Sequence, residues 1–94
     1  MPEYWRLGSS AEMWWDGAKE EVRLWAERAS GEKRLCRISR EAIEDYFDNP
    51  QDGDACLTAA QRNFDRITDA FLLRLGSEDL MEPDGSVLVR TEDL

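Results

Sequence analysis

The sequence has no histidine, only two cysteines and three prolines among its 94 residues, and fewer basic than acidic side chains. The absence of histidine excludes imidazole metal ligands, Ser-His and Cys-His nucleophile pairs, and a pH response near neutrality by an unperturbed side chain. Twelve Lys and Arg against 21 Asp and Glu give a net charge of -9. A phosphate-neutralising surface is therefore not expected, and we do not expect nucleic acid as a partner.

Long hydrophobic runs are also missing. No segment approaches the roughly 18 to 20 apolar residues of a membrane helix, and the first residues lack the basic stretch and apolar segment of a secretory signal. Cys36 and Cys56 are far apart, with no other Cys and no His, which fits neither a metal site nor a disulfide framework. We expect a cytoplasmic protein with two reduced, packed thiols, no membrane association and no cofactor.

Enough apolar side chains are present to build one modest core. Hydrophobic residues make up 41% of the chain and aromatic residues 10%, a composition typical of a folded chain. At this length we predict a single domain over residues 1–94. Within it, residues 1–12 are a candidate for a loosely ordered N-terminal segment.

Alternating apolar and polar residues predict a β-hairpin. The segments 21–28 and 33–38 have the period of strands, and Gly31 between them permits the positive φ of a turn. Residues 13–15, which precede Asp16-Gly17, predict a further short strand that ends in a turn.

Spacings of three and four predict two helices. Ser39 offers an N-cap to the first, which should end near Asp48 because Asn49-Pro50 disfavours the helical region. Asp52 or Asp54 can cap a second, longer helix, whose apolar series is Leu57, Ala60, Phe64, Ile67, Phe71 and Leu75.

The end of the chain predicts a return to the sheet. Gly76 follows the second helix, at the position where a left-handed residue is wanted. Residues 82–85 then predict a turn, and residues 86–90 a closing strand. The expected class is α+β: a small, mostly antiparallel sheet, made of the N-terminal hairpin plus the C-terminal strand, with two helices packed on one face.

Four segments carry a resemblance: Cys36-Arg37-Ile38-Ser39, Glu41-Ala42-Ile43-Glu44-Asp45-Tyr46-Phe47, Asn63-Phe64-Asp65-Arg66-Ile67 and Pro83-Asp84-Gly85-Ser86-Val87-Leu88-Val89. In this order they resemble a family of small bacterial proteins known as domain of unknown function 1488, over about residues 13–94. The resemblance implies a small α+β fold and a cytoplasmic bacterial origin. It implies no reaction, cofactor or site residue.

Six acids without an intervening base form the densest cluster: Glu41, Glu44, Asp45, Asp48, Asp52 and Asp54. Glu41, Asp45 and Asp48 share one helix face. A divalent-ion site is one interpretation. However, an EF-hand-like loop from Asp48 would have Pro50 and Ala59 at its third and twelfth positions, where oxygen ligands are needed. We expect a solvated acidic patch and no metal.

Three of the four tryptophans fall in the first 15 positions. Adjacent strand residues point to opposite faces, so at least one of Trp14 and Trp15 should be partly exposed unless another chain covers it. Trp25 is the one large apolar residue on the polar side of its strand. These indoles either form an aromatic patch that binds a protein, or become buried when the N-terminal segment folds back over the sheet.

Three functions remain open at this point. The first is a non-enzymatic protein-interaction or self-association module, with Trp14, Trp15 and Trp25 as candidate interaction residues and no catalytic residue. The second is an acidic polyanion mimic that regulates or inhibits a nucleic-acid-binding protein through the six-residue acidic patch. The third is a small DNA-binding regulator. It requires the seven bases of residues 19–40 to form one surface, rather than neutralise the protein's own acids.

Overall fold

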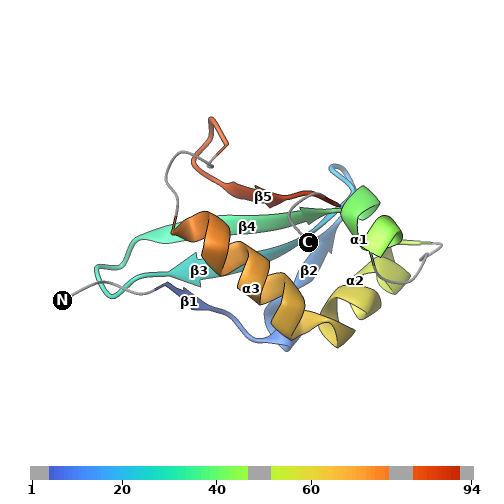
Figure 1. Cartoon of the computed structure of the whole chain (residues 1–94), viewed down its shortest axis with the longest axis horizontal. Helices are drawn as coiled ribbons and strands as arrows, with labels where there is room; N and C mark the ends of the chain where they lie inside the picture. The colour runs from blue at the N-terminus through green and yellow to red at the C-terminus, as the bar shows by residue number, and fades with distance from the viewer. Residues whose placement is uncertain (1–4, 47–51, 77–81, 92–94) are drawn as a thin grey trace.

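The computed structural model describes residues 5–46, 52–76 and 82–91. The elements follow one another as β1 (Arg6–Leu7), the 3-10 helix η1 (Ser10–Glu12), β2 (Trp14–Asp16), β3 (Glu21–Glu27), β4 (Lys33–Ser39), α1 (Arg40–Tyr46), α2 (Gly53–Arg62), α3 (Phe64–Leu75) and β5 (Val87–Val89) (Figure 1). The predicted α+β class is confirmed. No helix within these ranges is long and apolar enough to cross a membrane.

The five strands form one sheet in the order β1-β3-β4-β5, and β2 pairs with β3 on the same edge as β1. β1, β2 and β4 run antiparallel to β3, whereas β5 runs parallel to β4. The last pair is parallel because the chain leaves the end of β4, passes through the helices and re-enters beside the start of β4. The prediction of a mostly antiparallel sheet is confirmed.

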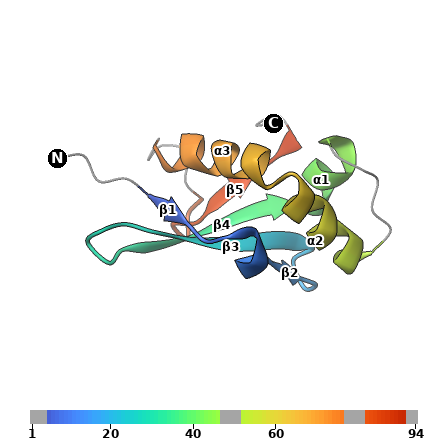
Figure 2. The ribbon, with the colours of Figure 1, turned by 90° about the horizontal axis from the view of Figure 1, so that it is seen from below.

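All three helices lie on one side of the sheet (Figure 2). The apolar side chains of β3 and β4 that point to this side are fully buried, and they form the core together with apolar residues of the helices and of β5. The largest fully buried side chains are Phe71, Leu24, Ile38, Ile43, Ile67, Val22, Val87 and Val89. The strand alternation read from the sequence therefore places the core where it was expected.

The turns and helix starts follow the predicted local chemistry. Gly31 has φ +90 in the β3–β4 turn. After β2, Asp16 Oδ1 accepts the backbone N–H of Ala18 at 2.9 Å. Ser39 Oγ caps α1, and Asp52 Oδ1 caps α2 by accepting the Ala55 N–H at 2.8 Å. The predicted end of the first helix near Asp48 lies outside the described residues.

The prediction of one long second helix is wrong, because α2 and α3 are separate helices divided at Asn63. Asn63 has φ -109 and ψ 29, and its side-chain amide donates to the Ala59 carbonyl at 2.8 Å. A short amide side chain that bonds to the backbone competes with the helix. The apolar spacing runs through the break because both helices face the same core, so it contains no sign of the interruption.

The left-handed cap predicted at Gly76 is also wrong. Gly76 does follow α3, but its φ of -76 and ψ of -8 are right-handed. Its N–H donates to the Leu72 carbonyl at 3.1 Å. The Gly76 N–H thus satisfies one of the last carbonyls of α3, and this hydrogen bond does not require a positive φ.

Arg6 and Leu7 of the N-terminal segment pair with β3 as β1. β1 and β2 act as one edge strand with a detour between them, since residues 8–13 lie opposite only two residues of β3, Leu24 and Trp25. Within the detour, Gly8 donates to the Trp25 carbonyl at 3.1 Å, and Met13 returns to the core.

Candidate functional site

The face of the sheet opposite the helices carries the candidate site, and we name it the outer face. None of the helices α1, α2 and α3 covers it (Figure 2). Strand register and alternation assign twelve residues to it: Arg6, Trp14, Asp16, Glu21, Arg23, Trp25, Glu27, Lys33, Leu35, Arg37, Ser39 and Leu88. Each alternates with a residue that points towards the helices.

Apolar side chains cross the outer face as a stripe, which we name the apolar stripe: Trp14, Trp25, Leu35 and Leu88. Trp25 is 50% exposed, and its ring centroid lies 6.5 Å from that of Trp14. Leu35 is the cross-strand partner of Trp25 in β4. Leu88 is half-buried on β5. The apolar stripe therefore contains one residue from each of the edge strands β2 and β5 and one from each of the central strands β3 and β4.

A network of ionic and polar groups lies beside the stripe, and we name it the charged network. At its centre is Glu21, which is only 3% exposed. Glu21 Oε1 accepts from Arg23 Nε at 2.7 Å and from Arg37 Nε at 2.8 Å. Arg23 Nη1 also meets Asp16 Oδ2 at 2.9 Å. These four residues carry no net charge together, and they tie β2, β3 and β4 to one another.

The charged network continues to the turn before β5. Arg37 Nη1 donates to Ser86 Oγ at 2.9 Å, and Ser86 Oγ donates to Asp84 Oδ1 at 2.6 Å. The hydrogen bond to Glu21 raises the pKa of Arg37 above its ordinary value, although desolvation opposes this. The hydroxyl and backbone N–H of Ser86 lower the pKa of Asp84. Arg37 and Asp84 are thus ionised at neutral pH, which keeps their hydrogen bonds formed.

The three predicted interaction tryptophans do not all lie together. Trp14 and Trp25 are in contact on the outer face, whereas Trp15 points to the helix side and packs half-buried against the core. A Cβ built at Gly53, in the first turn of α2, would overlap the Trp15 indole. Trp15 therefore holds β2 against α2. The expectation that adjacent indoles point to opposite faces, with at least one partly exposed, is confirmed.

Trp5 lies on the same side as Trp15 and packs half-buried against the core. The guanidinium of Arg28 lies 4.2 Å from its ring centroid, and that of Arg34 lies 5.4 Å away. These distances are those of cation–π contacts. The N-terminal segment therefore does bury part of its aromatic surface, while Trp14 and Trp25 stay on the outer face.

The predicted acidic patch is divided among structural roles. Glu44 Oε1 pairs with Arg40 Nε at 2.7 Å, Asp52 caps α2, and Asp45 Oδ2 accepts from Thr91 Oγ1 at 3.2 Å. Glu41 and Asp54 are exposed, and Asp48 lies outside the described residues. Among the residues that are described, no group of three or more Cys, Asp or Glu side chains could hold a metal ion.

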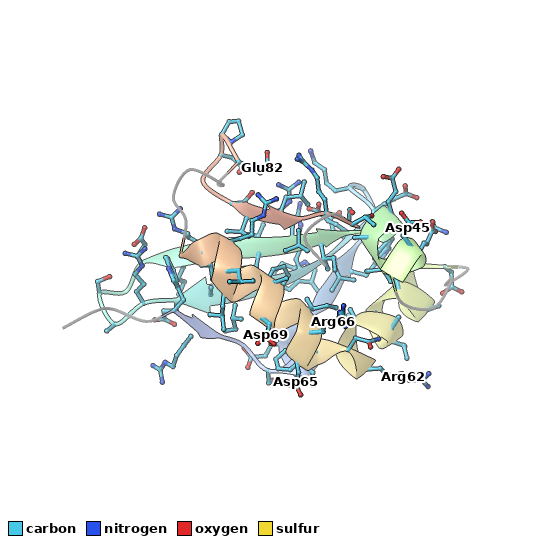
Figure 3. All side chains as sticks on the ribbon, viewed as in Figure 1. Asp45, Arg62, Asp65, Arg66, Asp69 and Glu82 are labelled. Atoms are coloured by element: carbon cyan, nitrogen blue, oxygen red, sulfur yellow. The ribbon has the colours of Figure 1, made fainter. Side chains whose placement is uncertain are left out.

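The helix layer has charges of both signs. Figure 3 shows Asp45 on α1, with acids and bases interspersed along α2 and α3: Arg62, Asp65, Arg66 and Asp69. These side chains belong to the side of the molecule opposite the outer face. The helix layer and the outer face are therefore two distinct surfaces that a partner could contact.

The bases of residues 19–40 do not form one continuous surface, because acids separate them. Besides the two arginines of the charged network, Arg34 pairs with Glu32 at 3.1 Å, and Arg40 bridges Glu20 at 3.2 Å and Glu44. The ion-pair partners come chiefly from residues 16–32. One partner comes from the segment 41–54, since Arg40 pairs with Glu44.

Cys36 and Cys56 are free and buried. Burial raises the pKa of Cys36 to about 12, against the opposing effect of Arg34. Burial also raises the pKa of Cys56, and Arg40 lowers it in part. Both thiols are protonated at neutral pH, so neither is an activated nucleophile.

Sequence reasoning missed Leu35, Leu88 and the role of Glu21. Alternation alone indicates that Leu35 and Leu88 point away from the core. Their proximity to the indoles depends on the pairing of β3 with β4 and of β4 with β5. In the sequence, nothing distinguishes Glu21 from any other acid in a strand. Its role depends on the pairing of β3 with β4, which brings Arg37 beside it.

Comparison with known proteins relates the fold to one solved structure of interest. It is the crystal structure of a protein of unknown function from the DUF1488 family of Shewanella loihica PV-4, with a TM-score of 0.79 and 13% sequence identity, over 95% of this chain and 94% of that chain. No protein-family model and no curated protein matches the sequence. The chain thus has the fold of this DUF1488 protein, in agreement with the resemblance of its sequence segments.

Proposed function

We propose that this chain is a non-enzymatic protein-interaction module that binds through the outer face. The observation that carries the proposal is the apolar stripe, with Trp25 half-exposed and in contact with Trp14 on a face that none of α1, α2 and α3 covers. Tryptophan is enriched among the residues that dominate binding energy at protein interfaces. A contiguous apolar stripe edged by polar groups is typical of such surfaces.

The charge distribution supports the same face. Four cations and three anions lie on it, although the whole chain has a net charge of -9. The described strand residues of this face therefore carry no excess of negative charge. A partner that approaches the outer face meets interspersed signs instead of a strong field of one sign.

Substitution of Trp25 tests the proposal. We expect Trp25→Ala to lose a partner that the unchanged protein retains in a pull-down from the source cells. The matched control is Leu73→Ala on α3, because Leu73 is 74% exposed on the opposite side of the molecule. Retention of the same partner by Trp25→Ala, or equal loss in both variants, would contradict the proposal.

The polyanion-mimic alternative has weaker support. Of the five described acids of the patch, Glu44, Asp45 and Asp52 already bind groups of this chain. Salt distinguishes the two functions, because binding of a basic partner by an acidic surface weakens steeply with salt, whereas aromatic anchoring does not.

We also propose a cytoplasmic location, which the two free cysteines support.

A further inference from the structure

We propose that the outer face binds a second copy of this chain, around a two-fold axis that runs between β3 and β4 and parallel to them. This inference rests on the proposed function, because it names the occupant of the same face. A two-fold interface requires self-complementarity: where residue i contacts residue j of the other copy, residue j must contact residue i. The outer face satisfies this requirement in the way its chemistry is distributed.

Rotation about such an axis places β3 of one copy over β4 of the other. Each outer residue of β3 then faces its own cross-strand partner from the second copy. Trp25 is paired with Leu35, and Glu27 with Lys33. The rotation therefore stacks an indole on a leucine and a carboxylate on an ammonium group, and each contact occurs twice.

The flanking strands extend the same symmetry. Trp14 lies beside Arg23 at the β2 edge, and Leu88 lies beside Arg37 at the β5 edge. Because Arg23 and Arg37 are themselves cross-strand partners, the rotation brings Trp14 over Leu88. The whole apolar stripe is thereby matched with its own image.

The one pair of like charges is compensated inside each copy. Arg23 and Arg37 would face each other across the axis, but both donate to Glu21, and Arg23 also pairs with Asp16. This part of the face presents no net charge to the other copy. The contact therefore costs far less than two unpaired cations would.

The size of the face indicates a reversible dimer. Strands about 4.8 Å apart and a rise of about 3.4 Å per residue make the face roughly 19 Å wide and roughly 24 Å long. The area of a face with these dimensions is below the roughly 800 Å² that each partner buries in a standard stable interface. We expect monomer and dimer to exchange with protein concentration.

A charge-swap experiment tests the arrangement. Glu27→Lys leaves only cations at the Glu27 and Lys33 positions, and Lys33→Glu leaves only anions. Each variant alone places like charges across the axis, so we expect its dimerisation to weaken about tenfold, measured by sedimentation equilibrium. An equimolar mixture of the two variants should recover the affinity of the unchanged protein, because cations then face anions.

The mixture also excludes a trivial explanation. Each substitution puts like charges side by side within its own hairpin, and mixing the two chains leaves that defect in place. Recovery in the mixture therefore reports the contact between chains and not the folding of either one. A mixture that associates no better than the separate variants would overturn the proposed axis.

Two further outcomes separate this inference from the proposed function. A monomer at every concentration, together with a partner that Trp25→Ala loses, overturns the second copy as occupant and leaves the interaction module standing. A dimer that neither the charge swaps nor Trp25→Ala affects overturns the proposed axis, because the copies would then associate through another surface, and if Trp25→Ala also retains every partner of the unchanged protein, the interaction module is contradicted as well.

Discussion

Glu21 joins the two arginines of the outer face, and its replacement is the most direct way to probe the charged network. In Glu21→Gln, the Arg23 and Arg37 guanidinium groups keep their positive charges and lose the carboxylate they share. We expect the free energy of unfolding to fall by about 1 to 3 kcal/mol, as measured by urea denaturation.

Glu27→Gln is the matched control, because Glu27 is exposed on the same strand. Its effect should stay within about 0.5 kcal/mol. Equal losses in the two variants would show that Glu21 contributes no more than any strand carboxylate on this face.

Among the elements, those specified by neighbouring residues could be predicted from the sequence. The hairpin, the Ser39 and Asp52 caps and the turn at Gly31 all depend on residues a few positions apart, and all are present. The break at Asn63 depends on a side-chain hydrogen bond that competes with a continuous helix, and propensity alone does not resolve such a competition.

β1 was missed for a different reason. A strand of two residues has no periodicity of its own, and it exists because Trp5 packs on the core and β3 offers a free edge. In the candidate site, too, features set by neighbouring residues could be predicted, and features set by strand pairing could not. The outward direction of Trp25 could be read from alternation, whereas its position next to Trp14 and Leu35 required the register of three strands.

The dependence of β1 on Trp5 is testable by hydrogen exchange. Trp5→Ala removes the packing on the core and the contact with Arg28. We expect the Gly8 amide, which donates to the Trp25 carbonyl, to exchange about tenfold faster, equivalent to about 1.4 kcal/mol. Amides between β3 and β4 should keep their protection.

Trp25→Ala provides the comparison, since it removes an indole from the outer face and leaves the Trp25 carbonyl in place. It should leave the Gly8 amide protected. Loss of protection along the whole hairpin in Trp5→Ala would mean that Trp5 stabilises the sheet as a unit and not β1 alone.

At the scale of the whole molecule, the net charge predicts that added salt strengthens self-association. Two copies that each carry -9 repel one another, while the stripe through which they would meet is apolar. Raising the salt from about 0.01 M to about 0.1 M shortens the Debye length from about 30 Å to about 10 Å. Self-association should therefore become stronger as salt is added, as measured by sedimentation equilibrium.

A complex held by the acidic patch would respond in the opposite way, because salt screens attraction to a basic partner. The exposed Glu27–Lys33 contacts of the proposed dimer also weaken with salt, but each is a small contribution. Self-association that declines steadily as salt increases would argue against an interface centred on Trp25.

The detour between β1 and β2 bears on how the protein stays in solution. A long straight edge strand offers a row of backbone donors and acceptors to which strands of other molecules can add, and this is a route to fibres. Here one edge of the described sheet is divided into pieces of two and three residues around η1, and the other edge is the three-residue β5. Neither is a template for extended edge-to-edge growth, so the molecule can display a tryptophan-rich face while polymerisation along the hydrogen-bond direction is disfavoured.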